Sequence, residues 1–118
     1  MHEINEIETS LKDCEGAIAT AAMDYGKIAV SAARARADYD LAYAQELLKI
    51  SADGEKRTVG EKEALTLIAV QSLFMDCRIR EAEADALKRR IGALQSVLTS
   101  LQTRASLIKT ERSLTNYT

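Results

Sequence analysis

A heptad pattern of apolar residues over the first 42 residues is the feature that most constrains how this chain can fold. A seam of this kind, kept for about five heptads without a charged residue, is typical of a long helix packed along another helix. Alanine is frequent in its middle, which predicts a close approach of the partner helix. The seam positions are Ile4, Ile7, Leu11, Cys14, Ile18, Ala21, Tyr25, Ile28, Ala32, Ala35, Tyr39 and Ala42.

The composition favours helix along the whole chain. There is no proline or tryptophan among the 118 residues and only one Phe, whereas Ala, Leu, Glu, Lys, Arg and Gln are abundant and all favour helix. We therefore predict an all-α protein, a long antiparallel helical hairpin that resembles a coiled coil. Because two helices have too few layers to enclose a thick core, we also expect homo-oligomerisation.

The only convincing interruption of the helical pattern lies in residues 51–60, SADGEKRTVG. Asp53-Gly54 is a turn dipeptide whose glycine accepts a positive φ. Thr58 followed by Glu61 matches a capping box, in which two side chains satisfy the free amides at a helix start. The chain is therefore expected to reverse its direction here.

These signals set the expected boundaries. We predict one helical domain over residues 1–118, composed of a helix over 3–51, a turn over 52–58 and a helix over 59–113. Gly16 and Gly26 lie within the first helix, but the seam passes both without a change of phase. We expect them to be points of close packing rather than breaks.

The second helix carries two seams that differ in phase. In its first half the heptad positions are Leu65, Ile68, Ser72, Met75, Ile79, Ala82 and Ala86. In its second half they are Leu87, Ile91, Leu94, Leu98, Leu101, Ala105 and Ile108. The seams are one residue out of step, or about 100° around the helix. The halves are therefore expected to face different partners, with any break in the helix falling near residues 86–92.

The bulkier side chains of the second half predict contact with another subunit, either from one long helix or from a separate C-terminal oligomerisation helix. The alternative is a single kinked hairpin in which every seam is internal. The residues assigned to self-association are Leu87, Ile91, Leu94, Leu98, Leu101 and Ile108.

The sequence contains little that could support catalysis. His2 is the only histidine and stands at a terminus. The chain therefore lacks the histidines that a catalytic triad or a histidine zinc site needs. Cys14 and Cys77 lie in apolar contexts without a metal-type partner at short spacing, which predicts two reduced, buried thiols. We predict a protein that is not an enzyme and that needs no metal and no cofactor.

Charge and hydropathy limit which partners and which cellular location are expected. The net charge of -2, from 16 basic and 18 acidic residues, excludes a strongly basic nucleic-acid arm but permits local basic stripes. The acidic first eight residues do not resemble a signal peptide, and Ala64–Val70, the longest uncharged apolar stretch, is too short to cross a bilayer. We expect a soluble, cytoplasmic protein without a membrane partner.

The string ARARADY, residues 33–39, is the most informative polar cluster. Guanidinium groups beside aromatic rings are what a single-stranded nucleic acid needs, because the cations hold phosphates and the rings accept stacked bases. The alternative is an ordinary helix surface, since Arg34 and Arg36 each have an aspartate four residues further on. Residues 88–90, KRR, leave the same two interpretations open.

The order of these elements resembles the phage recombination mediators of the UvsY type. In that family a basic-Ala-Arg-x-Asp-Tyr string closes a long first helix, and residues 34–39 match it here. A second amphipathic helix follows, and the chain ends in a helix with an arginine followed shortly by Ile-Lys, matched by Arg104, Ile108 and Lys109. The resemblance covers roughly residues 28–114.

The resemblance implies a small helical accessory protein of phage DNA recombination, acting in the host cytoplasm. Such a protein self-assembles through its carboxy-terminal helices and binds single-stranded DNA, here through Arg34 and Arg36. It also contacts a RecA-like recombinase and a single-strand binding protein, and helps the recombinase load onto coated strands. The alternatives are a protein-only adaptor or inhibitor, for example of a host nuclease, and a structural coiled-coil assembly factor.

Overall fold

The computed structural model describes residues 2–116, which are helical apart from short connections and contain no strand. Helix α1 spans His2–Ser51, α2 spans Val59–Ala69 and α3 spans Gln71–Asn116. The all-α class is therefore confirmed. The chain divides into two units. The terminal unit joins the residues up to Tyr25 with those from Ala86 onward, and the central unit is Gly26–Asp85.

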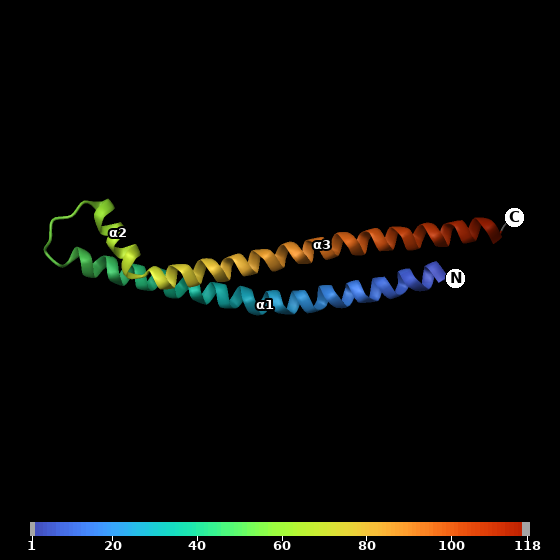
Figure 1. Ribbon diagram of the computed structural model, residues 1–118, viewed down its shortest axis with the longest axis horizontal. Helices are drawn as coiled ribbons and strands as arrows, with labels where there is room; N and C mark the ends of the chain where they lie inside the picture. Colours follow the sequence, from blue (N-terminus) through green and yellow to red (C-terminus); the bar gives the residue numbers. More distant parts are fainter. Residues whose placement is uncertain (1, 117–118) are drawn as a thin grey trace. The chain divides into compact units, whose positions relative to one another are not determined.

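The predicted seam of α1 is the face that packs in both units. Every seam position from Ile4 to Ala42 is buried or half-buried, and alanines such as Ala21, Ala32 and Ala35 are among the most buried residues. Within each unit, α3 runs antiparallel beside α1 (Figure 1). The heptad prediction for the first helix is therefore confirmed.

The expectation that Gly16 and Gly26 are points of close packing is wrong. Both are exposed, and a Cβ built on either would meet no atom within 4 Å. The reason is their place in the heptad, since each lies on the side of α1 away from the seam. The close approach between helices is made by the alanines of the seam instead.

The connection between α1 and α2 is ordered by Asp53. Gly54 has φ +78°, as expected from the Asp53-Gly54 dipeptide. The Asp53 carboxylate accepts a hydrogen bond from the backbone N–H of Glu55 at 3.0 Å and forms an ion pair with Arg57. Arg57 therefore stabilises the turn itself.

Thr58 begins α2 as the capping pattern predicted. Its Oγ1 accepts a hydrogen bond from the backbone N–H of Glu61 at 3.1 Å, and its own backbone is extended. The hydroxyl thus satisfies one of the amides that have no partner in the first turn.

The second helical segment is interrupted at Val70 and not within residues 86–92, where the sequence placed any possible break. Val70 has φ -107° and ψ 18°, whereas α3 continues through Gly92. The fully buried Thr66, one turn before the interruption, donates its hydroxyl back to the carbonyl of Lys62 at 2.7 Å. Val70 itself is buried.

The expected change of phase within the second helix is also wrong. In the central unit the inner residues of α3 are Cys77, Arg80 and Ala84, which continue the spacing of the Leu87–Ile108 seam backwards. The stripe predicted for this region is exposed, with Met75 at 51% and Ile79 at 54%. A helix that follows one partner keeps one face towards it, so the larger seam sets the phase.

Candidate nucleic-acid interface

Arg36, one of the two predicted DNA-binding residues, is held by neighbours from both long helices of the central unit. Its Nε lies 3.5 Å from Oδ1 of Asp40, and its Nη1 lies 3.5 Å from Oε1 of Glu81 on α3. Its Cζ also lies 5.7 Å from the centroid of the Tyr39 ring. Two carboxylates therefore already compensate the charge of this guanidinium.

Cys77 extends the same polar group towards the core. Its side chain is fully buried, and its thiol donates a hydrogen bond to Oε1 of Glu81 at 2.9 Å. The Glu81 carboxylate and, after it, burial raise the pKa of Cys77, because both disfavour the thiolate. The same bond, with the charge of Arg36, lowers the pKa of Glu81. Cys77 is therefore a protonated thiol at neutral pH.

Cys14 is the corresponding buried thiol of the terminal unit. Its Sγ donates to the backbone carbonyl of Leu94 at 3.2 Å. Both cysteines are free. The prediction of two reduced, buried thiols is confirmed, and both contribute to the contact between α1 and α3 within their own units.

The aromatic rings that were expected to accept bases pack on one another. The Tyr39 centroid lies 5.4 Å from that of Phe74 on α3 and 6.0 Å from that of Tyr43. All three side chains are half-buried. Tilted aromatic contacts of this kind stabilise the core of the central unit, so these faces are not open stacking platforms.

Arg34, the other predicted residue, has different surroundings. It is exposed and borders a surface hollow of about 290 Å³ in the central unit, together with Lys27 and Arg80. Among residues 2–116, no carboxylate lies within ion-pair distance of Arg34 or Lys27. The residues that line the hollow are Lys27, Val30, Ser31, Arg34, Ala35, Asp38, Asp76 and Arg80.

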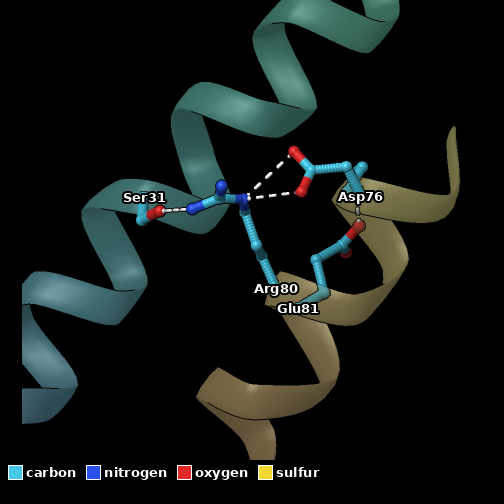
Figure 2. A network of polar contacts seen from close by, with 5 residues as sticks. Ser31, Asp76, Arg80 and Glu81 are labelled. Carbon is cyan, nitrogen blue, oxygen red and sulfur yellow. Dashed lines mark hydrogen bonds and ion pairs between the residues drawn. The ribbon is translucent and has the colours of Figure 1, made fainter. Parts of the chain in front are cut away.

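Arg80 is the residue of this hollow whose guanidinium is held by hydrogen bonds to two helices. Figure 2 shows its guanidinium reaching from α3 towards Ser31 of α1, with the Asp76 carboxylate on its other side. Its Nε lies 3.0 Å from both Asp76 oxygens, and its Nη1 donates to the Ser31 hydroxyl. The sequence did not single out Lys27 or Arg80. The clue for Lys27 is its spacing of seven residues from Arg34, which places both on one face of a helix.

The residues assigned to self-association lie on the half-buried face of α3 in the terminal unit. This face is turned towards α1 of the same chain, since Leu94 accepts the Cys14 hydrogen bond and Leu87 lines one hollow with Ala21. The six residues are Leu87, Ile91, Leu94, Leu98, Leu101 and Ile108. Large exposed apolar side chains lie outside this face. Examples on α1 in the central unit are Leu41, which is 61% exposed, and Leu48, which is 72% exposed.

The two helices of the terminal unit carry opposite charges. Up to Tyr25, α1 carries one cation, Lys12, against the acids Glu3, Glu6, Glu8, Asp13, Glu15 and Asp24. From Ala86 onward, α3 carries one acid, Glu111, against the cations Lys88, Arg89, Arg90, Arg104, Lys109 and Arg112. Asp24 and Arg90 line the same hollow. Because opposite charges on neighbouring helices attract, this division favours the antiparallel pairing over an open basic stripe.

Comparison with known proteins adds no relative. No family model matches the chain, and neither characterised proteins nor solved structures show a detectable similarity. Residues 2–116 contain no helix that is long and apolar enough to cross a membrane. Within the same residues, no three His, Cys, Asp or Glu side chains are grouped so that they could hold a metal ion.

Proposed function

We propose that this protein is a non-enzymatic recombination mediator that binds single-stranded DNA and helps a RecA-like recombinase load onto it. The observation that carries the proposal is the pair Arg34 and Lys27, two exposed cations beside one hollow with no carboxylate partner in residues 2–116. In a chain of net charge -2, such a pair marks a local place for a phosphate.

The proposal divides the roles of the two arginines. Arg34 contacts the phosphate backbone, whereas Arg36 connects α1 to α3 through Glu81. Because Tyr39, Tyr43 and Phe74 pack on one another, the DNA contact is to phosphates and not to stacked bases. Binding is therefore expected to depend on salt and to be nearly independent of base sequence.

The proposal includes self-association and two protein partners. One small cationic hollow binds a single strand weakly, but repetition of the hollow in a homo-oligomer raises the overall affinity through multivalency. Exposed apolar residues such as Leu41 and Leu48 offer surface for contacts between subunits or with partners. The partners are the recombinase and a single-strand binding protein, whose coated strands are the substrate for loading.

The test is the anisotropy of a labelled single-stranded oligonucleotide over a salt series. The parent protein should bind at low salt, with a slope of log affinity against log salt of about -0.7 for each phosphate contacted. Arg34→Ala should weaken binding and flatten the slope at unchanged helicity. Arg36→Ala is the matched control, because its main effect should be on thermal stability.

Absence of binding by the parent at low salt would overturn the DNA-binding proposal. So would an Arg34→Ala, Arg36→Ala double variant that keeps the parent affinity and slope. A second assay measures recombinase loading onto strands coated with single-strand binding protein. There the parent should shorten the lag of loading, and the double variant should not.

A protein-only adaptor, inhibitor or coiled-coil assembly factor is the second candidate. It is favoured by Leu41 and Leu48, two exposed apolar side chains seven residues apart on α1, because exposed apolar surface on one helix face can serve a protein contact. This candidate predicts that Leu48→Ser abolishes binding to the protein partner, while Arg34→Ala does not. The mediator requires Arg34, so this pair of variants separates the two candidates.

A further inference from the structure

We infer that the hollow bordered by Lys27, Arg34 and Arg80 is a site for one phosphodiester group of a nucleic-acid backbone. This inference rests on the proposed function and adds two residues and a ligand class to it. Lys27 and Arg34 are two turns apart on α1 and so share a face. Arg80 comes from α3 and completes the hollow from the other helix.

The guanidinium of Arg80 is positioned before any ligand arrives. The Asp76 carboxylate accepts a hydrogen bond from the Nε–H of Arg80, and the Ser31 hydroxyl accepts one from its Nη1. A guanidinium has five N–H donors, and within residues 2–116 the bonds formed by Arg80 leave its Nη2 donors unused. Since its side chain is already ordered, Arg80 loses little conformational freedom when it donates to an anion.

The charges around the hollow indicate a singly charged ligand. Lys27, Arg34 and Arg80 contribute three positive charges, and Asp38 and Asp76 contribute two negative charges. The excess is one positive charge. A phosphodiester carries one negative charge and is matched by this excess, whereas a phosphate monoester near neutral pH carries a second charge that the two carboxylates would repel.

The size of the hollow agrees with this ligand class. Its volume of about 290 Å³ leaves room for a phosphate group. The hollow is open to solvent at exposed residues such as Lys27 and Arg34. A phosphate group can enter while the attached sugars and bases stay outside, which suits a polymer that passes over the surface.

The inference is tested with two substitutions of opposite sign and one control. Lys27→Ala should weaken oligonucleotide binding by roughly threefold to tenfold and reduce the salt slope by about 0.7. Asp38→Asn should tighten binding by about twofold to fivefold, because it removes a carboxylate from the hollow. Lys49→Ala removes the same charge from an exposed position of α1 outside the hollow and should change binding by less than about twofold.

Equal effects of Lys27→Ala and Lys49→Ala would overturn the inference, since binding would then follow net charge alone. If the parent binds DNA but Lys27→Ala and Asp38→Asn leave its affinity unchanged, the site fails and the DNA-binding function stands through another surface. If the parent does not bind DNA, the proposed function fails.

A probe without DNA keeps the site testable in that last case. Dimethyl phosphate, a singly charged phosphodiester, is titrated into the full chain and followed by NMR. Shift changes should centre on Lys27, Arg34 and Arg80 and should disappear in Lys27→Ala. Inorganic phosphate at pH 8 should give weaker changes. Absence of shifts at these residues, or stronger binding of inorganic phosphate, would overturn the inference.

Discussion

Arg34 and Arg36 stand two positions apart on α1 and yet meet opposite environments. Two residues turn a helix by about 200°, so Arg36 reaches Glu81 on α3 while Arg34 borders the hollow. Both have an aspartate four residues further on, and only Arg36 is close enough to pair with its own. Local spacing describes both residues in the same way, so it could not tell the paired arginine from the available one.

Cys77 offers a prediction that depends on one contact. The Glu81 carboxylate and burial raise the pKa of the thiol, and only the thiolate reacts readily with alkylating agents. Iodoacetamide at pH 8 should therefore modify Cys77 slowly in the folded protein. Glu81→Gln should lower this pKa and speed the reaction, as measured by peptide mass spectrometry. Equal rates in the parent and in Glu81→Gln would show that the contact is unimportant.

The same shift has a consequence for stability against pH. A thiol whose pKa is higher in the folded state than in the unfolded state stabilises the fold below the unfolded pKa of about 8.5. This contribution is lost as the pH rises through the folded value. The free energy of unfolding, measured with urea between pH 7 and pH 10, should therefore fall above about pH 8.5. Cys77→Ala should have a flatter profile in this range.

Asp53 should show the opposite dependence. The hydrogen bond from Arg57, and after it the N–H of Glu55, lower the pKa of the carboxyl. A depressed pKa means that the stabilising contact is present above the unfolded value and is lost as the pH falls through the folded one. NMR titration of the Asp53 carboxyl should show a midpoint below its ordinary value. Arg57→Ala should return the midpoint towards that value; an unmoved midpoint would contradict the pair.

At the scale of the element, the contrast between the glycines is informative. Gly92 lies within α3, has a helical backbone and has no atom within 4 Å of a built Cβ. Gly54 lies in the turn with φ +78°. This conformation is sterically unfavourable for any residue that has a Cβ. The absence of a side chain therefore has no packing benefit at Gly92, whereas at Gly54 it allows the positive φ of the turn.

Gly92→Ala is accordingly expected to stabilise the protein by about 1 kcal/mol, because alanine reduces the backbone entropy lost in a helix. The measurement is the urea midpoint with the m-value checked for constancy. Gly54→Ala is the control and should destabilise. If Gly92→Ala lowers the midpoint, the residues around position 92 are not a regular exposed helix.

For the whole molecule, Leu98 tests whether the seam of the terminal unit is satisfied within one chain. Leu98 is half-buried on the face of α3 that packs against α1. Leu98→Asp places a charge there and should cost roughly 1–3 kcal/mol of unfolding free energy. Circular dichroism should show a lower melting temperature, and light scattering should show the mass of the parent. A smaller but equally stable species would mean that the seam is shared between subunits.

The sequence by itself determined the all-α class, the seam of α1, the positive φ of Gly54 and the Thr58 cap. These features follow from spacing along one helix and from the preferences of single residues. The tertiary structure decided which stripe of α3 lies inside, since the stripe of Cys77 packs although it carries Arg80, while the apolar stripe of Met75 is exposed. It also decided that Arg36 is paired while Arg34 borders a hollow with Lys27 and Arg80. Such choices depend on which residues of the second helix lie opposite the first, and long-range register is not encoded in local spacing.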